Sequence, residues 1–133
     1  MTYKFGEKSK RERETLHDDL KRLLDEIIKY YDFSIIEGYR SNERQNQIFK
    51  EEGSSKIGGE SKHNIYPSQA VDIAPYPIDW NDLHRFYHFI GYVKATAKQL
   101  GINIRCGADW DNDNNFKDQT FNDLNHIELI NIK

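Results

Sequence analysis

Residues 70–74 read Ala-Val-Asp-Ile-Ala, a short apolar run with one carboxylate at its centre. The run predicts a strand that ends at Pro75 and Pro77, because proline cannot donate a hydrogen bond to a sheet ladder. Side chains alternate between the faces of a strand, so Asp72 lies on one face of a strand otherwise made of small and apolar residues. A carboxylate in such surroundings needs compensation. A bound cation, a buried ion pair or a hydrogen bond to a neighbouring amide would each supply it.

Helical and strand patterns flank this run on both sides. Ser9 and Glu12 read as a capping box before leucines and isoleucines at helical spacing, and Ser41 is expected to cap a second, shorter helix. Asp79 is expected to cap a third helix, which Gly101 ends. The sequence thus predicts helices over 10–30, from 41 to 49–52 and over 80–100, and strands over 33–39, 70–74, 102–106 and 126–131.

The connections between these elements favour one fold class. Residues 51–62 are rich in glycine, serine and charge and read as a flexible loop, and the connections over 53–69 and 107–125 are long and irregular. Such a chain favours an α+β fold, with a small mixed or antiparallel sheet and helices packed on it, over a doubly wound parallel sheet. The length predicts one domain over residues 1–133, and we expect a monomer.

Composition excludes several classes of partner. A formal net charge of −3 removes the basic field that nonspecific nucleic-acid binding needs. The single cysteine, Cys106, cannot form an internal disulfide, and its apolar neighbours predict a packed side chain rather than a nucleophile. No apolar run has transmembrane length, and the first residues lack the apolar region of a signal peptide. We therefore expect synthesis in the cytoplasm and no membrane partner.

The five histidines fall into two groups. His17, His84 and His88 lie within predicted helices, and the i, i+4 pair formed by the last two lacks the acid of an HExxH helix. His63 and His126 instead lie near carboxylates, where loops meet predicted strands. These two are the better candidates for metal ligands.

Two imidazoles and one carboxylate, with a fourth position left for water, make a catalytic zinc site. Zinc lowers the pKa of its water to about 7, and a nearby base must then move the proton. The local sequence offers Asp123, Asp109 and Glu128 for that role. Glu128 follows His126 by two residues and so faces the same way on a strand. Local geometry leaves the choice of base open.

Several segments together are similar to one known family. SKHNIYPSQAVDIAPY, then RCGADW, then FNDLNHIELI occur in that order, after YKFG, YDFSIIEGYRS and IDW. In this order the motifs resemble the zinc D,D-carboxypeptidase and L-alanyl-D-glutamate peptidase family, which includes single-domain phage endolysins. The resemblance runs through nearly the whole chain and implies a small antiparallel sheet flanked by helices, of the hedgehog and D,D-peptidase type.

The resemblance also implies roles for particular residues. His63, Asp72 and His126 match the zinc ligands, one ion per chain, and Asp123 matches the acid that activates water and protonates the leaving amine. Arg40 and Ser61 match positions that bind the substrate, where a guanidinium can hold a carboxylate or a developing oxyanion. These residue assignments come from the resemblance.

This chain departs from the family pattern in one place. Eight residues separate His63 from Asp72, including Tyr66-Pro67-Ser68-Gln69, whereas the relatives have about six and often a glycine there. A longer loop is tolerable because the free energy of loop closure depends only weakly on length.

The acidic stretch from Asp109 to Asp118 offers oxygen ligands of the type that calcium prefers. An EF-hand frame over it lacks the glycine at position six and the glutamate at position twelve, which favours a solvated loop. A calcium ion there, which would order the loop leading to Asp123, is the alternative.

The resemblance implies an endolysin-like peptidoglycan hydrolase that cuts the L-alanyl-D-glutamate bond of wall stem peptides, after release from the cytoplasm. The alternatives are a D-alanyl-D-alanine carboxypeptidase or dipeptidase, and a non-catalytic zinc-stabilised wall-binding module. A metal nuclease that uses His63 and His126 is disfavoured by the charge balance.

Overall fold

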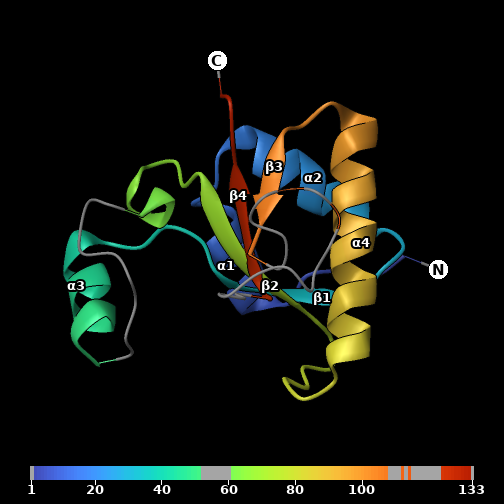
Figure 1. Cartoon of the computed structure of the whole chain (residues 1–133), viewed down its shortest axis with the longest axis horizontal. Helices are drawn as coiled ribbons and strands as arrows, with labels where there is room; N and C mark the ends of the chain where they lie inside the picture. Colours follow the sequence, from blue (N-terminus) through green and yellow to red (C-terminus); the bar gives the residue numbers. More distant parts are fainter. Residues whose placement is uncertain (1, 52–60, 108–111, 113, 115–123, 133) are drawn as a thin grey trace.

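The structure, a computed structural model, describes residues 2–51, 61–107, 112, 114 and 124–132. Its elements are shown in Figure 1. In chain order they are α1 (Glu7–Arg13), α2 (Asp18–Ile28), β1 (Phe33–Glu37), α3 (Asn42–Glu51), the 3-10 helix η1 (Lys62–Asn64), β2 (Ala70–Pro75), α4 (Leu83–Leu100), β3 (Ile104–Cys106) and β4 (His126–Leu129). The strands form one antiparallel sheet in the order β1-β2-β4-β3, which confirms the predicted α+β class with a small antiparallel sheet.

The sheet separates apolar from polar side chains. In β2, Val71 and Ile73 belong to the hydrophobic core, so the intervening Asp72 points to the opposite face. In β4, Ile127 belongs to the core, and His126 lies directly across from Asp72 in the strand register. One face of the sheet is therefore packed, and the other carries ionisable groups.

Helices α2 and α4 cover the packed face. They contact each other, α4 also contacts β2 and β3, and Figure 1 shows α4 running along the side of the sheet. Their buried apolar side chains, spaced three or four residues apart, join the core. From α2 these are Leu20, Leu23, Leu24, Ile27 and Ile28, and from α4 they are Phe89, Ile90, Val93 and Ala97. Cys106 is buried in the same core, as predicted.

The predicted helix over 10–30 is wrong, because the chain forms two helices with a break between them. Leu16, in the break, forms a parallel β-bridge with Ser68. The Ser68 amide donates to the Thr15 carbonyl at 2.8 Å, and the His17 amide donates to the Ser68 carbonyl at 2.9 Å. His17 then caps α2 by accepting a hydrogen bond from the Asp19 amide, so it does not lie within a helix as predicted. This pairing across the fold overrides the local helical pattern.

The predicted caps of two helices also differ from the structure. The N-cap of α1 is Gly6, whereas Ser9 lies inside the helix, where its buried hydroxyl accepts a hydrogen bond from the Ile35 amide at 3.0 Å. The hydroxyl thus joins α1 to β1. The N-cap of α4 is Asp82 rather than Asp79, three residues later than predicted.

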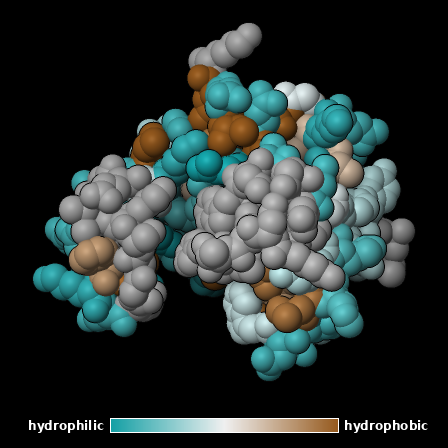
Figure 2. All heavy atoms as spheres, viewed as in Figure 1, coloured by the Kyte–Doolittle hydropathy of each residue, from teal (hydrophilic) through white to brown (hydrophobic). Residues whose placement is uncertain are grey.

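The surface carries apolar side chains before and at the start of α4. Four of them are each at least 38% exposed, namely Tyr76, Ile78, Trp80 and Leu83. Figure 2 shows a small hydrophobic patch at that lower end of the molecule and a larger one at the opposite end, near the C-terminus, on a surface that is otherwise largely hydrophilic. Within the described ranges, no helix combines the length and the apolar character needed to cross a membrane.

Gly38 lies where β1 approaches the break between α1 and α2. A Cβ atom there would lie 2.5 Å from the Thr15 hydroxyl oxygen and 2.8 Å from the Glu12 carbonyl oxygen. Gly91, on α4, has no atom within 4 Å of the same position.

We expect Gly38→Ala to destabilise the fold by about 1–3 kcal/mol, because the added methyl group overpacks this contact. Gly91→Ala is the matched control, and we expect it to stabilise the protein by about 0.5–1 kcal/mol through helix propensity. Urea denaturation measures both changes. Equal unfolding midpoints for the two variants would show that the contact at Gly38 is not tight.

Candidate metal centre

Three side chains converge on the polar face of the sheet. Asp72 on β2 and His126 on β4 are register partners, and η1 brings His63 to them from the loop before β2. The His63 Nε2 atom lies 3.5 Å from Asp72 Oδ1, and the His126 Nδ1 atom lies 3.4 Å from the same oxygen. One ligand atom from each residue lies within 4.8 Å of the others. This spacing suits three ligands of a single metal ion.

The polar atoms of this cluster fit a bound cation. His63 Nε2 and Asp72 Oδ1 are both buried, and neither has a hydrogen-bond partner. A buried polar atom without a partner is costly, and a metal ion would satisfy both atoms. Two imidazole nitrogens and a carboxylate oxygen are also the donor types that zinc and similar divalent ions accept.

The electrostatics keep Asp72 ionised. Burial by itself would raise the pKa of its carboxyl group, but polar contacts with His126 and His63 outweigh burial and lower that pKa below its usual range. The carboxylate is therefore in the charged form that a metal ligand requires.

His63 is held by its neighbours in the chain and by Gly38, the residue that follows β1. Its Nδ1 atom lies 2.7 Å from the Gly38 carbonyl oxygen, and its ring is almost fully buried. The Ser61 hydroxyl accepts a hydrogen bond from the His63 amide, and the Asn64 side chain accepts one from the Ser61 amide. Ser61 thus caps η1, and its predicted contact with substrate stays a prediction.

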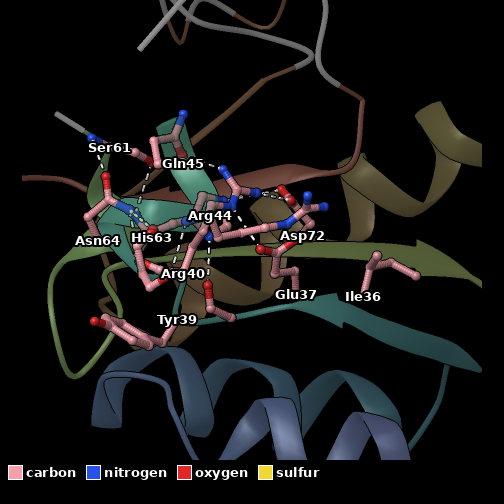
Figure 3. Close-up of polar contacts among 12 residues, drawn as sticks. Ile36, Glu37, Tyr39, Arg40, Arg44, Gln45, Ser61, His63, Asn64 and Asp72 are labelled. Carbon is pink, nitrogen blue, oxygen red and sulfur yellow. Dashed lines mark hydrogen bonds and ion pairs between the residues drawn. The ribbon is translucent and has the colours of Figure 1, made fainter. Parts of the chain in front are cut away.

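Arg40 lies against the cluster with its guanidinium spread over three partners, as Figure 3 shows. Its Nε donates to Glu37 at 2.8 Å, its Nη1 donates to Gln45 at 2.8 Å, and its Nη2 donates to Asp72 Oδ2 at 3.3 Å. The strand register between β1 and β2 shifts after Ile35, and this irregularity pairs Glu37 with Asp72. The structure therefore brings Arg40 to the second oxygen of the candidate ligand.

Glu128 faces the same way as His126, as the strand period predicted, and lies behind it. Its Oε1 is 2.9 Å from His126 Nε2, while its Oε2 lies 2.9 Å from Arg105 and 3.4 Å from Lys62. Burial opposes ionisation, but the contacts with His126 and with the cationic Arg105 lower the pKa of Glu128 to about 2. Glu128 is an ionised partner of a candidate ligand.

The remaining predicted residues lie elsewhere. Asp123 and the acidic stretch from Asp109 to Asp118, apart from positions 112 and 114, are outside the described residues. His84 and His88 lie on α4, as predicted, and His88 Nδ1 is 3.0 Å from the Tyr31 hydroxyl. Neither belongs to the three-residue cluster.

Four residues of the site had not been predicted. Glu37 and Arg105 are charged side chains in otherwise apolar strands, a signal of the kind that identified Asp72. Gln45, a polar residue within a predicted helix, and Lys62, whose partner Glu128 is distant in the sequence, carry no such signal.

The fold and the cluster define a small α+β protein with a candidate metal site made of two histidines and one aspartate. A family model described as phage L-alanyl-D-glutamate peptidase matches residues 1–130. The chain is 32% identical to the L-alanyl-D-glutamate peptidase of Escherichia phage T5 over 139 residues, which cover 98% of this chain and all of that relative. This chain belongs to the family of phage L-alanyl-D-glutamate peptidases.

A solved structure shares the fold. The crystal structure of the Serratia marcescens L-Ala D-Glu endopeptidase ChiX superposes with a TM-score of 0.76 at 24% sequence identity. The match covers 96% of this chain and 90% of that one.

Divalent ions provide a direct test of the cluster. We expect Zn²⁺, added to metal-free protein, to raise the thermal midpoint, with about 2.7 kcal/mol of stabilisation at a hundred times the dissociation constant. His63→Ala should abolish the rise, because it removes the buried unpartnered nitrogen. His84→Ala, at an exposed position on α4, should keep it. Equal stabilisation of the two variants would place the metal elsewhere.

Proposed function

We propose that this chain is a zinc-dependent peptidoglycan hydrolase that cleaves the L-alanyl-D-glutamate bond of wall stem peptides. The observation that carries the proposal is the cluster of His63, Asp72 and His126, with two buried unpartnered atoms, in a member of this family. The phage T5 relative bears the name of this activity. We further propose that residues 1–133 act as one catalytic domain, as a monomer, on the wall after release from the cytoplasm.

The donor set supports zinc in a catalytic rather than a structural role. The cluster offers three ligands, and no fourth His, Cys, Asp or Glu joins it among the described residues. A structural zinc site is usually closed by four protein ligands, whereas a catalytic site leaves one position open. When bound, zinc would polarise the substrate carbonyl and lower the pKa of a coordinated water to about 7.

We assign the movement of the proton to Asp123. The Ile73 amide donates to the Asn125 carbonyl at 2.9 Å, so the chain just before His126 is tied to the strand that carries Asp72. Asp123 precedes Asn125 by two residues in the sequence. Glu128 is the weaker candidate, because both of its oxygens already contact cationic or N–H groups.

We propose that Arg40 binds the substrate. A guanidinium carries five N–H donors, and the contacts with Glu37, Gln45 and Asp72 use three of them. Those contacts fix the plane of the group beside the cluster. The other N–H groups are suited to a substrate carboxylate or to the negative charge that develops on the carbonyl oxygen.

Digestion of purified peptidoglycan tests the bond that is cut. We expect mass spectrometry to show peptides with a new amino-terminal glutamate residue and glycan strands that keep L-alanine. Release of terminal D-alanine alone would instead identify a carboxypeptidase. Absence of any cleavage by zinc-loaded protein would favour a wall-binding module.

Asp123→Asn tests the proposed base. We expect turnover to fall by about 100- to 10,000-fold, because a positioned general base contributes that much, while zinc content stays near one ion per chain. Asp79→Asn, at an exposed carboxylate near the start of α4, is the matched control for loss of one charge. Full turnover in Asp123→Asn would exclude this residue as the base and direct attention to Glu128.

A further inference from the structure

The two candidate histidine ligands present different ring nitrogens to Asp72. His63 points its Nε2 at the carboxylate, whereas His126 points its Nδ1 at the same oxygen. A neutral imidazole carries one N–H, and only the other nitrogen has the lone pair that binds a metal. The two rings must therefore hold their protons on opposite nitrogens for both to act as ligands.

Each ring has an acceptor at the nitrogen that must carry the proton. At His63 the partner is the Gly38 carbonyl oxygen, 2.7 Å from Nδ1. At His126 the partner is Glu128 Oε1, 2.9 Å from Nε2. Both partners accept hydrogen bonds and lie at hydrogen-bond distance, whereas Asp72 Oδ1 lies farther from the opposite ring nitrogens, at 3.5 and 3.4 Å, so the shorter contacts favour a proton on Nδ1 of His63 and on Nε2 of His126. The backbone thus sets one tautomer, and a side chain sets the other.

Glu128 is itself fixed in place. It is 1% exposed and lies opposite Arg105 in the register of β3 and β4. Arg105 donates to Oε2 at 2.9 Å, and the Lys62 ammonium group lies 3.4 Å from the same oxygen. Because Arg105 and Lys62 both lie at Oε2, the other carboxylate oxygen, Oε1, accepts the hydrogen bond from His126.

We propose that Glu128 is a positioning residue that holds the proton of His126 on Nε2 and so presents Nδ1 to the metal. The inference rests on the proposed function in one respect, namely that a metal ion binds at this cluster. According to this inference, Glu128 orients the ligand His126 and does not act as the base that moves the proton. A carboxylate behind a ligating histidine both orients the ring and makes the ligand nitrogen more basic.

Lys62 connects Glu128 to the segment that carries His63. Lys62 directly precedes His63 in η1, and its ammonium group contacts both Glu128 and the Leu129 carbonyl. One carboxylate therefore contacts His126 itself and the element that carries His63.

Glu128→Gln is the sharpest test, because it changes hydrogen-bond polarity with little change in shape. The amide oxygen of the new side chain would face Arg105 and Lys62, since both are donors only. Its NH₂ group would then face His126 and donate to Nε2, which moves the ring proton to Nδ1. We expect Zn²⁺ affinity, measured by competition with a chelator, to fall by about 10- to 100-fold.

Glu37→Gln is the matched control, because this substitution also removes one carboxylate near the cluster. The Glu37 side chain contacts Arg40 rather than a histidine. We expect a smaller loss of Zn²⁺ affinity in this variant. An equal loss in both would show that only the net charge matters and would overturn the inference.

Long-range proton–nitrogen NMR spectra of the metal-free protein, at alkaline pH, read the tautomers directly. In the parent protein we expect His126 to be protonated on Nε2 and His63 on Nδ1. Because the two tautomers differ, the signals of each ring serve as an internal reference for those of the other. A parent His126 protonated on Nδ1 would overturn the inference without any variant. If the tautomers are as expected but Zn²⁺ does not bind, the metal-dependent function fails while the role of Glu128 on the ring stands.

Discussion

Placement of an ionised carboxylate, Asp72, at the centre of the sheet is the constraint on which the rest of the structure depends. One side of the sheet can be packed with aliphatic side chains only if the charge is turned to the other side. Successive side chains of β2 and β4 point to opposite faces of the sheet, which turns the charge of Asp72 away from the core. The strand register also brings His126 opposite Asp72. Core and candidate site thus arise from the same alternation, so a one-residue slip of β4 would damage both.

The groups around the cluster balance one another in charge. Among the described residues, the carboxylates of Glu37, Asp72 and Glu128 face the cations of Arg40, Arg105 and Lys62, which gives three negative and three positive groups. Neutral imidazoles add nothing to this sum, so a divalent ion would add two positive charges to these balanced groups. That excess would attract an anionic water-derived nucleophile and an acidic substrate, and D-glutamate is acidic.

Much of the fold could be predicted, because it depends on local patterns. The strand around Asp72, the helix that ends at Gly101 and the shared face of His126 and Glu128 follow from period, cap chemistry and strand alternation. The break between α1 and α2 could not be predicted, since it depends on a bridge to Ser68, 52 residues after Leu16. The residues of the candidate metal cluster were predicted through the order of motifs and the resemblance, while the contacts of Gln45 and Lys62 become visible only in the folded chain.

That bridge has a consequence for how the family can vary. The segment between His63 and Asp72 is secured at His63 by the Gly38 carbonyl and at Ser68 by backbone hydrogen bonds with Thr15 and His17. The four residues between these anchors can vary in number while the two anchors hold the candidate ligands in place, because loop closure depends only weakly on length. The longer loop that the family resemblance predicts for this chain contains this stretch. Evolution could thus reshape the rim of the site while the candidate ligands keep their positions.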